Sequence, residues 1–170
     1  GEDSARAIRT LLEIAPKLEG PEVYRAIVAA ISKARPGAQA EEFLAAARSP
    51  ASREQRIVIA EAVAASPTGR EELVADYLLE KDEAVIRILL DTMRIQRFRR
   101  GVDSLITILE RHESGEWRKP SLAIEVRGLL VRLLGRDFDS ARDYRNFWNE
   151  RRAKWDPDEP DPQAVTGSTV

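Results

Sequence analysis

The densest basic cluster of the chain consists of Arg94, Arg97, Arg99 and Arg100, with Phe98 among them. Guanidinium groups bind carboxylate and phosphate oxygens, so the cluster is a candidate contact site for an acidic partner. A helix C-terminus also attracts cations without any partner. One aromatic residue among four arginines gives little support for nucleic acid, because stacking residues usually alternate with the basic ones. The composition therefore favours a solvated turn over a contact site, and both interpretations stay open.

Trp117 is the second candidate for partner contact. It lies in the longest irregular stretch of the expected domain, 113–119, outside any helical stripe. Loop aromatics often serve as binding anchors, and they equally often fold back to cover the end of a helix pair. The sequence does not decide between these roles, so Trp117 joins the four arginines as a candidate partner-binding residue.

No set of residues predicts catalysis. His112 is the only histidine, and the chain has no cysteine, so His112 beside Glu110 and Glu113 lacks the second soft ligand of a metal site. We expect His112 to be an exposed residue in the last turn of a helix. No glycine-rich phosphate loop and no motif for a Ser/His/Asp set occurs. The sequence thus predicts no enzyme activity, no cofactor and no metal.

A repeat organises the elements that must position these residues. Four arginines, at spacings of 31, 31 and 40 residues, each precede a short apolar run: Arg25, Arg56, Arg87 and Arg127. Each run lies in a helix-like stretch that follows another one, which is typical of an α-solenoid. Equivalent residues of stacked repeats form a row. We therefore expect that the arginines bind mainly carboxylates of their own repeat and of the next one. The less favoured alternative is that they bind an acidic partner.

Apolar residues at offsets of three and four predict nine helices and no strands. We expect helices at about 4–15, 21–34, 38–48, 53–65 and 140–154, and one that begins near 120. Three more are expected around the apolar stripes at 73–78, 85–93 and 102–109. Ser52, Thr68 and Asp82 are the expected N-caps of the fourth, fifth and sixth helices. The apolar stripe of the eighth includes Leu122, Ile124 and Val126.

The pattern resembles HEAT repeats. The matching stretches open the second helices of four pairs: 22–25, 54–56, 84–87 and 125–127. In addition, 134–138 and 144–148 resemble the closing segment of many bacterial HEAT-repeat proteins, although Asp139 replaces the usual glycine and Tyr144 the first tryptophan. The resemblance implies an all-α, right-handed solenoid of about four hairpins with a C-terminal capping helix, and a scaffold or adaptor role. Trp148 and Trp155 would then cover the last hairpin.

The expected organisation is a repeat domain over 1–155 and a disordered, acidic, proline-rich tail over 156–170. Because the chain starts at Gly1, we expect it to be part of a longer protein. No apolar run reaches the ~18–20 residues of a membrane span. We expect a soluble protein, cytoplasmic or exported within a longer chain; its compartment and oligomeric state stay open.

The function predicted from these features is a non-catalytic protein-interaction or scaffolding module that binds a partner protein or peptide on the face of its second helices. The less favoured alternative is a nucleic-acid-binding module, because residues 94–154 carry 15 Lys/Arg against 9 Asp/Glu. A resemblance to HEAT-like DNA glycosylases would require an aspartate beside tryptophans, which the sequence alone does not place. A structural spacer without a partner is the third possibility.

Overall fold

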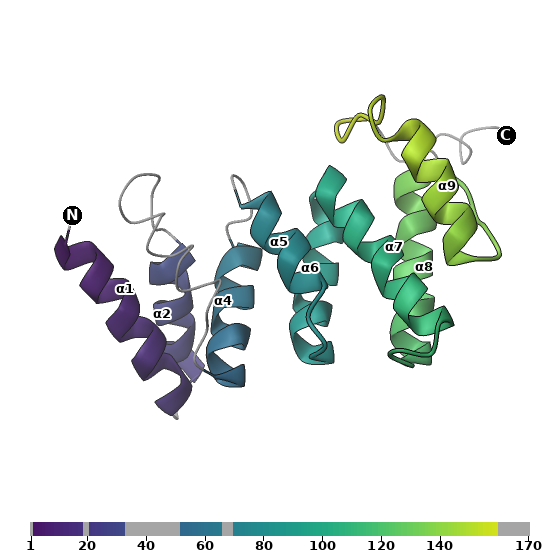
Figure 1. Cartoon of the computed structure of the whole chain (residues 1–170). Coiled ribbons are helices and arrows are strands. Elements are labelled where there is room, and N and C mark those ends of the chain that lie inside the picture. The colour runs from purple at the N-terminus through teal and green to yellow at the C-terminus, as the bar shows by residue number, and fades with distance from the viewer. Residues whose placement is uncertain (1, 19–20, 33–51, 66–69, 160–170) are drawn as a thin grey trace, which may run out of the picture. The chain divides into compact units, whose positions relative to one another are not determined.

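The structure, a computed structural model, describes residues 2–18, 21–32, 52–65 and 70–159. Within these ranges the chain forms eight α-helices and one short 3-10 helix and contains no strand, which confirms the all-α class (Figure 1). The elements are α1 (Glu2–Ile14), η1 (Ala15–Lys17), α2 (Pro21–Ser32), α4 (Arg53–Ala65), α5 (Glu71–Leu78), α6 (Glu83–Ile95), α7 (Arg99–Glu113), α8 (Pro120–Leu134) and α9 (Ala141–Arg151). The helix expected at 38–48 and the expected cap Thr68 lie outside the described residues.

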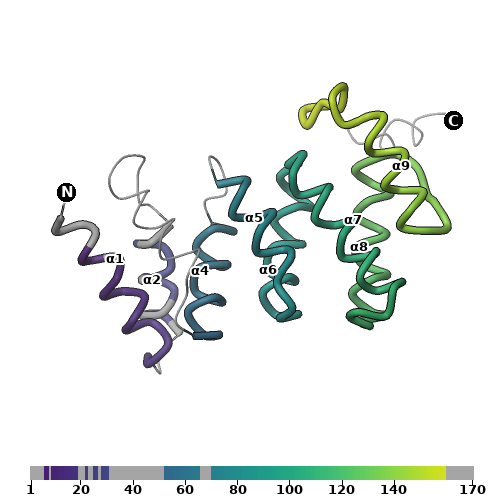
Figure 2. Tube along the Cα trace, viewed as in Figure 1, coloured from purple at the N-terminus to yellow at the C-terminus, as the bar shows by residue number. Residues whose placement is uncertain are grey.

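The chain divides into two compact units, Gly1–Val74 and Ala75–Val170, with the division inside α5. Figure 2 follows the backbone through both. In the first unit, α4 packs against α1, η1 and α2. Apolar residues of α4, including Val58, Ile59 and Val63, are buried there. Ser52 caps α4 as predicted, because its Oγ accepts a hydrogen bond from the Gln55 N–H at 3.2 Å.

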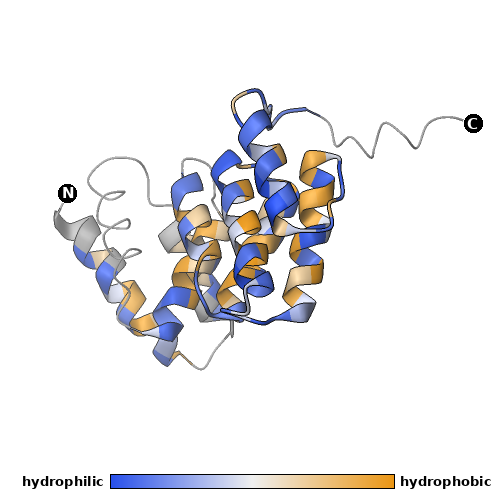
Figure 3. Cartoon of the chain, turned by 45° about the vertical axis from the view of Figure 1, so that its right-hand side comes forward, coloured by the Kyte–Doolittle hydropathy of each residue, from blue (hydrophilic) through white to orange (hydrophobic). Residues whose placement is uncertain are grey.

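In the second unit, α7 packs against α8 and α9, and α8 also packs against α6. The predicted cap of α6 is confirmed, since Asp82 Oδ1 accepts from the Ala84 N–H at 3.0 Å. The predicted apolar stripes of α6 and α7 are buried: Val85, Ile86, Leu89, Leu90 and Met93, and Val102, Leu105, Ile106 and Leu109. Colouring by hydropathy shows the resulting apolar and polar sides of the helices (Figure 3).

The helix α8 carries the candidate site and departs from the predicted stripe at one residue. Leu122 and Val126 are buried as expected, but 74% of Ile124 is exposed. Ile124 lies two positions from each of them, and at about 100° per residue this offset places it on a different side of the helix. The helix ends at Gly135, whose φ of 71° lies in the left-handed region that glycine adopts without a steric penalty.

The last helix, α9, is shorter than predicted. Ser140 caps it, because its Oγ accepts from the Asp143 N–H at 3.2 Å. It ends at Arg151 rather than near Lys154, and turns follow. The expected tail boundary at 156 stays a prediction; the described residues 156–159 form a turn. None of the described helices is long and apolar enough to cross a membrane.

Candidate interaction site

The predicted basic cluster lies at the connection between α6 and α7, where much of it contacts the chain itself. Arg97 Nη2 donates to the Leu133 carbonyl at 3.3 Å, and Arg97 Nη1 contacts the Glu159 carbonyl. Arg99 Nη2 donates to the Trp155 carbonyl at 2.7 Å. Two of the four candidate arginines therefore hold the segment that follows α9.

The other two differ in their surroundings. Arg94, in the last turn of α6, forms ion pairs with Asp91 and with Glu125 of α8. Arg100 is exposed in the first turn of α7. The structure does not bring Trp117 to this cluster, because Trp117 follows the far end of α7, a helix of 15 residues and hence about 22 Å long. Trp117 is half-buried, and its backbone N–H donates to the Arg111 carbonyl at 3.1 Å.

Two of the repeated arginines bind carboxylates, Arg87 in the expected way and Arg127 through Asp137, which follows α8. Arg87 Nε and Nη2 donate to Glu83 one turn earlier, at 3.1 and 2.7 Å, and Nη1 donates to Glu125 of α8. The hydrogen bond from Arg87 lowers the pKa of the Glu83 carboxyl. Arg127 Nε donates to Asp137 at 2.8 Å. These contacts support a structural role for the two arginines.

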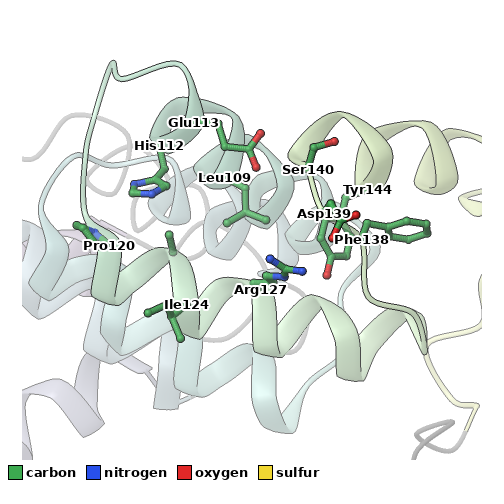
Figure 4. A pocket seen from close by; sticks show the side chains of 11 residues that line it. Leu109, His112, Glu113, Pro120, Ile124, Arg127, Phe138, Asp139, Ser140 and Tyr144 are labelled. Carbon is green, nitrogen blue, oxygen red and sulfur yellow. The ribbon is translucent and has the colours of Figure 1, made fainter.

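A pocket with a cavity volume of about 320 Å³ lies beside α8 (Figure 4). Three elements line it: the end of α7, the first half of α8, and the stretch from Phe138 into α9. Its apolar lining residues are Leu109, Pro120, Ala123, Ile124, Phe138 and Tyr144, and its polar ones are His112, Glu113, Arg127, Asp139 and Ser140. None of these residues was predicted as a partner contact.

Asp137 binds two residues that line one end of the pocket, Arg127 and Tyr144. Its Oδ1 accepts from Arg127 Nε at 2.8 Å and from the Tyr144 hydroxyl at 2.9 Å. The hydrogen bond from Arg127, followed by that from Tyr144, lowers the pKa of the Asp137 carboxyl. Burial, aided by Asp137, raises the pKa of Tyr144 to about 12. At neutral pH this end therefore holds an ion pair and a neutral phenol.

The other polar lining groups are also bound to the protein. Both carboxylate oxygens of Glu113 accept from the Ala141 N–H, at 2.9 and 3.1 Å. This N–H group is the first of α9 and has no acceptor within the helix. His112 Nδ1 accepts from the Lys119 N–H at 3.2 Å, which assigns the proton of the neutral ring to Nε2. His112 is half-buried, so the expectation that it is exposed was wrong. The loop 114–119 turns back onto it.

A polar network joins α7 to α9 on Asp103. Trp148 Nε1 donates to Asp103 Oδ1 at 2.9 Å, and Arg145 and Arg152 form ion pairs with the same carboxylate at 3.3 and 3.1 Å. The structure thus places an aspartate beside a tryptophan, which the sequence alone did not. Trp148 is fully buried, however, so its ring offers no face for a base to stack on. The pair is a structural contact.

The sequence contained one signal for the pocket that the prediction missed. Ile124 is an apolar residue of α8, but the helical period does not place it on the same side as the buried Leu122 and Val126. An apolar residue on the other side of a helix points away from the core. The remaining lining residues come together only through packing of α7, α8 and 138–144. No group of three or more His, Cys, Asp or Glu suited to a metal ion occurs among the residues that the structure describes.

Comparison of the chain with protein-family models, with curated proteins and with solved structures finds no match.

Proposed function

We propose that this chain is a non-catalytic protein-interaction module, a short α-solenoid of HEAT-like helix hairpins. The contacts of Arg87 support the repeat, because Arg87 binds Glu83 of its own helix and Glu125 of α8, the second helix of the next expected pair. Such contacts between equivalent helices are what a row of stacked repeats requires.

The observation that carries the interaction role is the pocket beside Ile124. An isoleucine that is 74% exposed at the edge of an apolar pocket leaves hydrophobic surface that a partner can bury. Full burial of such a side chain contributes about 1.5–3 kcal/mol. Binding sites are typically concave and mostly apolar, and Ile124 belongs to the lining of such a pocket.

The bonds within the lining favour binding over catalysis. Glu113 satisfies the start of α9, and Arg127 is paired with Asp137. These groups support the walls of the pocket, so its apolar surface would contribute most of the recognition. The basic C-terminal half gives less support to a nucleic-acid partner, because Arg97, Arg99 and Arg145 donate to acceptors of the chain itself.

The test is affinity capture from native extract with the full chain as bait, with and without nuclease. Ile124→Gln removes the exposed apolar side chain, and Ser121→Gln adds the same amide to an exposed position of the same helix outside the pocket. We expect a protein that is retained after nuclease treatment and by Ser121→Gln, but lost with Ile124→Gln. Retention that disappears with nuclease would favour the nucleic-acid module, and an absence of any retained protein would favour the spacer.

A further inference from the structure

Arg87 and Arg127 hold equivalent places in the repeat, and their contacts can be compared directly. Each lies in a helix of the second unit, α6 and α8. Arg87 holds two carboxylates: Glu83 from its own helix, and Glu125 from α8, which packs alongside. The second contact is therefore made by a neighbouring helix.

Arg127 has neither of these contacts; its carboxylate partner, Asp137, follows the end of α8. Its Nε donates to Asp137 at 2.8 Å, and among the described residues Asp137 supplies its only carboxylate. Arg127 also lines the pocket. Among the described residues, the terminal nitrogens of Arg87 bind Glu83 and Glu125, whereas the ion pair of Arg127 with a carboxylate uses its Nε.

The apolar residue one turn earlier shows the same difference. Ala84 and Ile124 each lie three positions before the arginine. Ala84 is half-buried, whereas 74% of Ile124 is exposed. Arg87 of α6 is contacted by the neighbouring helix α8. At the equivalent places α8 carries Arg127 and the exposed Ile124.

We infer that an α-helix of the partner protein binds along α8, placing one large apolar side chain in the pocket beside Ile124 and one carboxylate on Arg127. This rests on the proposed function and names its partner class. A pocket of about 320 Å³ is at the small end of ligand sites, which suits a single anchoring side chain. An amphipathic helix supplies an apolar residue and an acid one turn apart on the same face. Asp139 on the rim would repel further acids, so one carboxylate is expected.

The probe copies the chemistry by which α8 contacts Arg87. It is an acetylated, amidated and fluorescein-labelled peptide of Ala, Gln and Lys that contains Leu-Ala-Ile-Glu-Val, the sequence of 122–126. A second peptide carries Gln in place of the Glu. Circular dichroism establishes that both peptides form helix to the same extent, and fluorescence anisotropy measures their binding to the full chain.

We expect the Glu peptide to bind the unmodified chain and Ser121→Gln equally, and Ile124→Gln at least tenfold more weakly. The Gln peptide should bind the unmodified chain about fivefold more weakly than the Glu peptide, and that difference should vanish in Arg127→Gln. Because Ile124 is exposed, its substitution tests the site without a change in the core.

Two results would overturn the inference: equal binding to the unmodified chain and to Ile124→Gln, or no binding of the Glu peptide at millimolar chain concentration. Either would leave the proposed function standing if native extract still yields a nuclease-resistant protein partner. If the capture yields no protein but the peptide binds as expected, the proposed function is contradicted and the helix-binding site on α8 is supported.

Discussion

The guanidinium of Arg97 lies over the ring of Trp155, with its central carbon 5.2 Å from the ring centroid. The Trp155 indole N–H donates to the Leu133 carbonyl at 3.2 Å, and the ring meets Trp148 edge to face at 5.4 Å. Arg97 thereby joins the α6–α7 connection to the segment that follows α9. An arginine that by sequence is a candidate for partner contact thus takes part in the internal packing of the second unit.

We predict that Arg97→Gln loosens this segment without unfolding the helices. The variant loses a cation–π contact worth about 0.5–1 kcal/mol at a partly exposed site, and hydrogen bonds of similar value. Exchange of the Trp155 indole hydrogen with solvent, followed by NMR, should become about tenfold faster. Arg142→Gln, at an exposed position of α9, is the control and should leave that rate unchanged. Equal rates in both variants would show that Arg97 does not hold Trp155.

Removing Arg145 should destabilise the fold far more than removing Arg152. Arg145 Nε and Nη2 donate to Glu110 at 2.9 and 3.0 Å, and its side chain is only 24% exposed. The hydrogen bond to Glu110 raises the pKa of the Arg145 guanidinium. Arg145→Ala leaves Glu110 and Asp103 with fewer partners and should lower the free energy of unfolding by about 2–3 kcal/mol.

Arg152→Ala is the matched comparison, because Arg152 pairs with the same Asp103 but is 49% exposed. Exposed ion pairs contribute only about 0–1 kcal/mol. Urea unfolding of both variants measures the difference. Similar losses for the two arginines would mean that the network is no more than a surface contact.

Two glycines of α8 should respond in opposite directions to alanine. Gly128 lies inside the helix and is exposed, and no heavy atom outside the local backbone lies within 4 Å of the place of an added Cβ. Gly128→Ala should therefore stabilise the fold by about 0.5–1 kcal/mol. Gly135 ends the helix with a φ of 71°, so Gly135→Ala should destabilise it by about 1 kcal/mol.

Thermal unfolding of the two variants and the parent chain tests both statements together. Since the same substitution is made at both positions, a general effect of the added methyl group would shift both in the same direction. Shifts of equal sign would contradict the assignment of Gly135 as a left-handed helix end.

The raised pKa of Tyr144 predicts a loss of stability at high pH. The folded value is about 12 and the ordinary value is 10.0, so between these two the unfolded phenol ionises while the folded one stays protonated. A raised folded pKa contributes stability that is present below pH 10 and decreases as the pH rises towards 12. The free energy of unfolding should fall by on the order of 2 kcal/mol over this range.

Tyr144→Phe provides the reference for that experiment. It lacks the phenol and its bond to Asp137, which should cost about 1 kcal/mol at neutral pH. Its stability should then change less than that of the parent chain between pH 10 and 12. Identical pH profiles for the two proteins would exclude Tyr144 as the source of the effect.

Helices and their starts were predictable because they depend on neighbours in sequence. Asp82 and Ser52 cap their helices through N–H groups two and three residues away, so a local pattern contains the information. The same holds for the buried stripes of α6 and α7, which follow the helical period. The shortened α9 and the half-buried His112 were predicted wrongly, because turns that follow these helices decide both.

The sequence by itself determined an all-α chain, the caps of α4 and α6, and a carboxylate upstream of Arg87, Glu83, that binds it. Only the tertiary structure decided what the polar side chains contact. Arg97 contacts Glu159, which lies 62 positions away in the sequence, and Asp103 binds Trp148, which lies 45 positions away. No local pattern specifies such pairs. The pocket likewise exists only where α7, α8 and 138–144 meet. Local hydrogen bonds and helical period shape the elements, whereas packing between distant segments selects which side chains remain exposed for a partner.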